Sequence, residues 1–108
     1  MTYDELLDLY RNEVKNWLQR NGYIVSNHIV DIIQSVVMTR DKVHHYPGHF
    51  AQAVVNNDLR EVINRADQEC LENLKIIYQG FFNIDTWHIV KPYKKQLTLD
   101  LEQTLENE

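Results

Sequence analysis

Apolar residues recur at alternating steps of three and four along the first part of this chain, which is the spacing of one face of an α-helix. In residues 2 to 21 this apolar stripe consists of Tyr3, Leu7, Tyr10, Val14 and Trp17. Thr2 and Glu5 match a capping box, in which a side-chain oxygen accepts a hydrogen bond from an amide of the first turn. Gly22 is a natural C-terminal stop. The pattern predicts a helix over residues 2 to 21.

A second helix is predicted to begin at Ser26 or Asn27, either of which can cap it, and to end at the Pro47-Gly48 pair. Apolar residues occupy much of its circumference, so we expect it to be central in the fold or to bury a second face in a dimer. The β-branched residues from 29 to 37 would also suit a strand. The 3.6-residue phase and the lack of turn residues favour a helix.

The second half of the chain opens with a short helical turn over residues 50 to 54. The apolar phase then slips at residues 56 to 58, where Asn and Asp side chains can bond the local backbone, so we expect a break there. A long helix should follow from about 58 to 79. Its predicted apolar stripe is Leu59, Ile63, Ala66, Cys70, Leu74, Ile77 and Phe81. After Gly80 the pattern weakens, and we expect a loop or short helix packed over the bundle.

These elements predict an all-α fold, a compact helical bundle of three main helices plus a short helix, followed by an irregular C-terminal segment. The 108 residues fit one domain, which we place at residues 1–95. Residues 96–108 form an acidic tail that we expect to fray at its end. Within this tail Leu97, Leu99 and Leu101 alternate as in a strand, while Leu101 and Leu105 suit a helix.

Charge and cysteine content narrow the classes of function. The net charge of −5 disfavours a general nucleic-acid binder, which needs a cationic surface to release counterions from phosphate. The single cysteine, Cys70, cannot form an internal disulfide, which favours a reducing compartment and predicts a cytoplasmic location. The N-terminus lacks an apolar run of signal-peptide length, and the longest apolar run is too short to span a membrane.

Three of the five histidines lie close together on either side of the predicted helix end at Pro47-Gly48. These residues, His44, His45 and His49, are weak candidates for metal ligands, since imidazole is a common ligand and Asp41 lies one turn before His45. No cysteine pair or HExxH motif accompanies them. Histidine near the C-terminal end of a helix is also favourable by itself, so we expect a solvated loop without a metal.

Cys70 lies on the apolar stripe of the predicted long helix, where a buried thiol behaves as a small hydrophobic side chain. A nucleophilic role would require an activating base and partial exposure. His28 or His88 could supply that base in space, but nothing in the spacing indicates it. The chain has no phosphate-binding glycine loop and no GxSxG motif. We therefore predict no catalytic residues, no enzymatic activity and no cofactor.

Aromatic residues are frequent in the second half of the chain, and some of them should remain near the surface. We predict an interaction role, because aromatic anchors are typical of interface centres, for Tyr46, Phe50, Tyr78, Phe81, Phe82, Trp87 and Tyr93. The segment KPYKK places Lys91, Lys94 and Lys95 around Tyr93, a pattern that can hold single-stranded nucleic acid. A flexible surface segment is the simpler interpretation of these lysines.

Residues 47 to 87 resemble a loosely defined family of small phage and prophage proteins. The shared pattern is P-G-x-F-x-x-A-V-x-x-N-D-L, then R-A-D, then L-x-x-I and an aromatic-Asn pair. The matching residues are Pro47, Gly48, Phe50, Ala53, Val54, Asn57, Asp58, Leu59, Arg65, Ala66, Asp67, Leu74, Ile77, Phe82 and Asn83. Family members often have Asn where Cys70 stands. The resemblance implies phage origin and an accessory role in the host cytoplasm, without a mechanism.

The sequence thus predicts a small non-enzymatic phage or prophage accessory protein that acts through protein–protein interaction with a host or phage protein. We also expect a homodimer, through the second helix or the aromatic-rich second half. The alternative is a nucleic-acid-associated regulator that uses the local basic patch of residues 91 to 95. No membrane partner is predicted.

Overall fold

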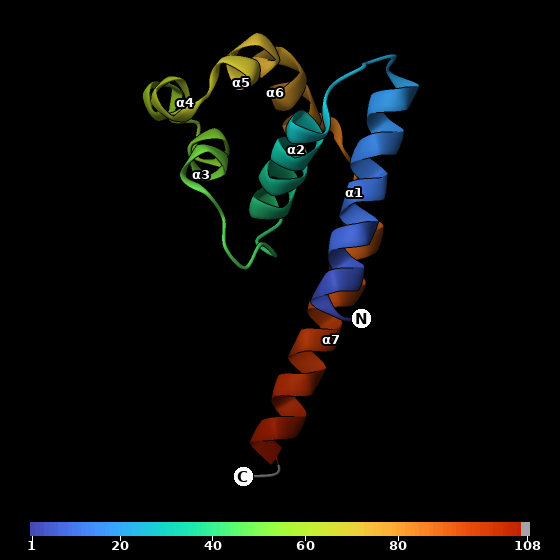
Figure 1. The fold of residues 1–108 in the computed structure, drawn as a ribbon. Coiled ribbons are helices and arrows are strands. Elements are labelled where there is room, and N and C mark those ends of the chain that lie inside the picture. The colour runs from blue at the N-terminus through green and yellow to red at the C-terminus, as the bar shows by residue number, and fades with distance from the viewer. Residues whose placement is uncertain (107–108) are drawn as a thin grey trace.

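The computed structural model describes residues 1–106 and folds them into helices and connecting turns, with no strand among them (Figure 1). The predicted all-α fold is therefore confirmed. The seven helices of the described residues are α1 (Tyr3–Arg20), α2 (Asn27–Arg40), α3 (His49–Val55), α4 (Leu59–Arg65), α5 (Gln68–Glu72), α6 (Leu74–Asn83) and α7 (Trp87–Glu106). None of these helices is both long enough and apolar enough to cross a membrane.

Local capping explains where the first two helices begin. The Thr2 hydroxyl accepts a hydrogen bond from the Glu5 amide at 3.2 Å, as the capping box predicted. The Thr2 hydroxyl in turn donates to the Glu5 carboxylate. Ser26 caps α2 by accepting from the Ile29 amide. Gly22 adopts a φ of +73° directly after α1, a conformation that glycine adopts without steric cost.

Helix α2 is the central element, as its apolar circumference predicted. It packs against α1, α3 and α6 (Figure 1), and Ile29, Ile33 and Val36 are fully buried along it. These neighbours cover the face that could otherwise have served a dimer. The helix ends at Arg40, earlier than the predicted stop at Pro47-Gly48, and Lys42 at a φ of 62° turns the chain away.

The single helix predicted from 58 to 79 is wrong, because the chain breaks twice within it. Ala66 is extended, and Asp67 then caps α5 by accepting from the Cys70 amide at 2.8 Å. Asn73 separates α5 from α6, with its side-chain amide bonded to the Glu69 carbonyl. The predicted stripe also fails at its start, where Leu59 is 63% exposed and Val62 is buried instead.

Gly80 lies inside α6 rather than at its end. A Cβ atom at this position would lie 3.0 Å from Ile33 Cγ2, so the absence of a side chain permits the close approach of α6 to α2. Helix α6 then continues to Asn83. Chain reversal follows at residues 84 to 86, where Ile84 and Thr86 are buried.

The predicted irregular C-terminal segment is also wrong, since α7 runs from Trp87 to Glu106 with Pro92 inside it. Its first half packs on α1, where Ile89, Val90 and Tyr93 are buried. Its second half extends beyond the N-terminus of α1 (Figure 1). The radius of gyration, 15.3 Å, exceeds the roughly 13 Å expected for a domain of this length because of this extension. Residues 107 and 108 of the predicted fraying tail lie outside the described residues.

Candidate functional site

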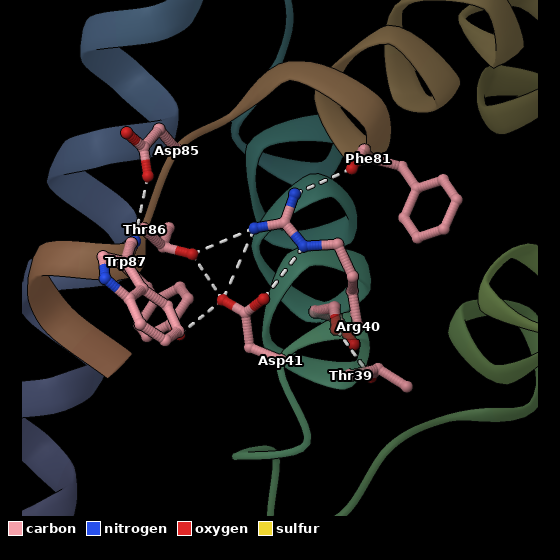
Figure 2. Close-up of polar contacts among 9 residues, drawn as sticks. Thr39, Arg40, Asp41, Phe81, Asp85, Thr86 and Trp87 are labelled. Atoms are coloured by element: carbon pink, nitrogen blue, oxygen red, sulfur yellow. Dashed lines mark hydrogen bonds and ion pairs between the residues drawn. The ribbon is translucent and has the colours of Figure 1, made fainter. Parts of the chain in front are cut away.

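The most connected polar network lies where α2 ends and α7 begins (Figure 2). Arg40 donates to the Phe81 carbonyl at 2.7 Å and to the Thr86 hydroxyl at 2.9 Å. Its Nε also pairs with the Asp41 carboxylate at 2.9 Å. The hydroxyls of Thr86 and Tyr10 both donate to Asp41 Oδ2. The network therefore joins α1, α2, α6 and the start of α7.

The charges in this network are balanced from within the chain. Burial by itself would raise the pKa of Asp41, but hydrogen bonds from Arg40, Thr86 and Tyr10 outweigh it and hold the pKa below 3.8. Burial and the same carboxylate raise the pKa of the Tyr10 phenol well above its ordinary value. No buried side-chain nitrogen or oxygen among the described residues lacks a hydrogen-bond partner. The network is thus a structural clamp, since every group is already engaged.

The three candidate histidines between α2 and α3 have separate environments. His45 stacks on Tyr3 with ring centroids 3.6 Å apart, and His44 Nδ1 accepts from the Tyr46 amide. His49 begins α3 and is exposed. Within the part of the chain that the structure describes, these histidines do not meet in a group of three metal-ligating side chains.

A different group of metal-ligating side chains does converge, between the start of α2 and α5. It consists of His28, Asp67 and Cys70, whose ligand atoms all lie within 4.8 Å of one another. His28 Nε2 lies 2.7 Å from Asp67 Oδ2 across 39 residues of sequence. The other carboxylate oxygen, Oδ1, accepts from the Cys70 amide. His28 and Asp67 are about half exposed, while Cys70 is buried, so the thiol forms the floor of the cluster.

The order of groups in this cluster does not suit nucleophilic catalysis. The Asp67 carboxylate bonds His28 on one side and the Cys70 amide on the other. Burial and this carboxylate raise the pKa of the Cys70 thiol to about 12, so the thiol is protonated at neutral pH. A cysteine nucleophile instead requires a lowered pKa. The prediction that Cys70 is buried is confirmed, and of its two possible neighbours His28 is the one in the cluster. His88 pairs with Glu13.

The seven predicted interaction aromatics do not form one surface. Tyr78, Phe81 and Phe82 cluster at the end of α6, with the two phenylalanine rings 5.0 Å apart. Phe82 is 70% exposed, whereas Phe81 and Tyr78 are half-buried. We call these three residues the α6 aromatic cluster.

The remaining predicted aromatics are dispersed. Tyr46 is exposed in the turn before α3, and Phe50 is half-buried against the core. Trp87 is exposed at the start of α7, where the Lys91 ammonium lies 5.6 Å from its ring centroid. Tyr93 is buried, so it cannot act as the surface aromatic of the basic segment.

Sequence reasoning missed the network around Asp41 and found only the His28 and Cys70 part of the second cluster. The Arg40-Asp41 pair is visible in the sequence, but its partners Thr86 and Tyr10 come from other helices and no spacing marks them. Asp67 stands in the sequence as the last residue of an Arg-Ala-Asp segment. Its cap at Cys70 follows a local rule, whereas its contact with His28 depends on how α5 packs against α2.

The segment that carries the resemblance to phage proteins is built from local structural devices. Asn57 adopts a φ of 57°, Asp58 caps α4 by accepting from the Glu61 amide, and Arg65 pairs with Glu61 at 3.2 Å. These residues explain architecture rather than chemistry. Comparisons of the chain with protein-family models, with curated proteins and with solved structures gave no match. The resemblance stays a prediction from the sequence.

Proposed function

We propose that this chain is a small non-enzymatic phage or prophage accessory protein that binds a host or phage protein in the host cytoplasm. The α6 aromatic cluster carries the proposal. Phe82 exposes 70% of its surface beside two further aromatic rings. A cluster of large apolar side chains at the surface is typical of a protein-binding site, and aromatic residues dominate the binding energy of such sites.

The cluster is held on a rigid support. The Phe81 carbonyl accepts from Arg40, so the end of α6 is tied to the clamp around Asp41 (Figure 2). The close packing of α6 on α2 at Gly80 fixes the preceding turn. A partner would therefore meet aromatic rings whose backbone is already ordered, which lowers the entropy lost on binding.

A pair of matched substitutions tests this site. Phe82→Ala removes the exposed ring of the cluster, while Trp87→Ala removes a ring of similar exposure, 64%, from the start of α7. Tagged protein should retain one stoichiometric protein from a phage-infected bacterial lysate at low and at high salt. Phe82→Ala should lose it and Trp87→Ala should keep it. Equal retention by both variants would contradict the proposed site.

We also propose a homodimer, formed through the outer half of α7. Leu97 and Leu101 are 50% and 62% exposed, and they continue by helical spacing the line of the buried Tyr93. The helix is basic at Lys94 and Lys95 and acidic at Glu102. Two copies packed antiparallel would place each basic end beside the other's acidic end, whereas parallel packing would place like charges together.

The oligomeric state of the full chain tests this part of the proposal. The wild-type protein should sediment as a dimer, and Leu101→Glu should sediment as a monomer. Leu99 lies two residues away on a different side of the helix and is 45% exposed, so Leu99→Glu adds the same charge off the proposed face. A monomeric wild type, or dissociation by both substitutions alike, would contradict the antiparallel pairing.

The alternative proposal, a nucleic-acid-associated regulator, rests on the exposed lysines Lys91, Lys94 and Lys95 along one part of α7. The burial of Tyr93 and the position of Lys91 over Trp87 leave this segment without the base-stacking ring that the sequence suggested. Retention of nucleic acid that falls steeply as salt rises would favour this alternative over protein binding.

A further inference from the structure

We propose that His28, Asp67 and Cys70 form a binding site for one Zn²⁺ ion, which would join the start of α2 to α5. The ligand atoms are a ring nitrogen, a carboxylate oxygen and a thiol sulfur within 4.8 Å of one another. They come from two helices that are distant in sequence. No part of the proposed interaction function requires this cluster.

The distances are close to those of a tetrahedral zinc ion. Zinc–ligand bonds of about 2.0–2.3 Å place neighbouring ligand atoms about 3.3–3.8 Å apart. In the cluster His28 Nε2 and Asp67 Oδ2 are 2.7 Å apart, and no pair of ligand atoms exceeds 4.8 Å. Side-chain rotations that move each atom by about 1 Å would therefore place the three ligand atoms at three corners of a tetrahedron.

The chemistry of the ligands selects the metal. Thiolate and imidazole are ligands of zinc and other late transition metals, whereas Mg²⁺ and Ca²⁺ prefer oxygen alone. Cys70 forms the buried floor, and the half-exposed His28 and Asp67 leave access from solvent. Three protein ligands leave the fourth position of the tetrahedron to a water molecule. Binding would displace the thiol proton, as zinc binding to cysteine generally does.

The surrounding hydrogen bonds orient two of the ligands. Asp67 Oδ1 accepts from the Cys70 amide at 2.8 Å, which fixes the carboxylate over the thiol and leaves Oδ2 toward His28. The Ser26 hydroxyl donates to the Glu69 carboxylate, so α5 is held against the start of α2 by a second contact. Partners of this kind orient metal ligands and raise metal affinity.

The test is a titration of the full-length, metal-free protein with Co²⁺, a spectroscopic substitute for Zn²⁺. Wild-type protein should bind one equivalent with a thiolate-to-cobalt charge-transfer band, and Zn²⁺ should displace it. Cys70→Ala should lose the band. His28→Gln should weaken Co²⁺ affinity by at least about tenfold. His49→Gln, a substitution of an exposed histidine outside the cluster, should bind as wild type does.

Two outcomes would overturn the proposal. The first is the absence of a stoichiometric thiolate band in the folded wild-type protein. The second is equal Co²⁺ affinity of His28→Gln and His49→Gln. Circular dichroism of each metal-free variant checks folding, and zinc should raise the melting temperature of wild type but not of folded Cys70→Ala.

Discussion

Asp41 and Asp67 are both carboxylates at helix ends, but Asp41 is nearly buried within a hydrogen-bond network whereas Asp67 is half-exposed to solvent. Asp41 follows α2, is only 13% exposed and accepts from three side chains, so its hydrogen-bonding capacity is used within the fold. Asp67 precedes α5, is 54% exposed and contacts one histidine and one amide above a thiol. The Asp41 clamp is closed and holds four helices together. The Asp67 cluster is open to solvent on one side.

The two carboxylates should also differ in how much they contribute to stability. Removing any member of a closed network lowers the free energy of unfolding, because the remaining members stay buried without a hydrogen-bond partner. Removing a member of a solvent-exposed cluster changes the free energy of unfolding little, because water replaces the missing contact. We therefore expect substitutions around Asp41 to lower the free energy of unfolding strongly, and substitutions around His28 to lower it little in the metal-free protein.

The largest effect is expected for Asp41→Ala. The substitution leaves the Arg40 guanidinium, which is 23% exposed, without its carboxylate, and we expect a loss of about 3 kcal/mol in the free energy of unfolding. Urea unfolding followed by circular dichroism measures it. Asp31→Ala is the matched control, since it breaks the exposed pair with Arg11 and should cost less than about 1 kcal/mol. Similar losses in the free energy of unfolding for both variants would contradict the view that Asp41 contributes more than an exposed ion pair does.

Thr86→Val should give the next largest effect. The Thr86 side chain is buried, accepts from Arg40 and donates to Asp41, and valine keeps the shape without either bond. We expect a loss of about 2 kcal/mol in the free energy of unfolding. Thr98→Val removes an exposed hydroxyl that bonds only the Lys94 carbonyl, so it should change stability by less than about 0.5 kcal/mol. A Thr86→Val protein as stable as Thr98→Val would contradict the clamp.

Acid should weaken the clamp to a smaller extent than removal of the carboxyl group. The pKa of Asp41 is lowered in the folded protein from 3.8, so its stabilising contribution is complete above that pH and is lost as pH falls through the folded pKa. Urea unfolding at a series of acidic pH values should show this loss in wild type and a flatter acid limb in Asp41→Asn. Identical slopes below pH 3.8 in both proteins would exclude Asp41 as the group responsible.

Local rules in the sequence were sufficient to predict where a helix begins when a polar capping residue precedes its first apolar residue. Thr2 and Ser26 precede the first two helices, and both cap as expected. The breaks at Ala66 and Asn73 were missed because an apolar stripe continues through them. Helix α7 was missed because the apolar pattern weakens after Gly80 and the leucines from 97 to 101 also suit a strand.

The candidate site was less accessible to sequence reasoning than the fold. Cys70 was correctly placed in the core, and His28 was considered as a neighbour, but their approach depends on the break at Ala66, which turns α5 toward α2. The aromatic cluster was predicted in part. Phe81 and Phe82 do meet at the surface, whereas the neighbours of Tyr93 in three dimensions bury it. Tertiary contacts between distant segments produce no recognisable spacing pattern in the sequence.

The smallest effect is expected for His28→Gln. In the metal-free protein His28→Gln removes only an exposed contact with Asp67, and we expect a change of less than about 0.5 kcal/mol in the free energy of unfolding. Urea unfolding in the presence of a chelator measures it, and His88→Gln, which removes the comparable contact with Glu13, is the control. If His28→Gln destabilises the metal-free protein as much as Thr86→Val does, the cluster is a second structural clamp and not an open site. A small change would mean that the position can exchange its contact for a ligand without loss of the fold, as a site built for binding requires.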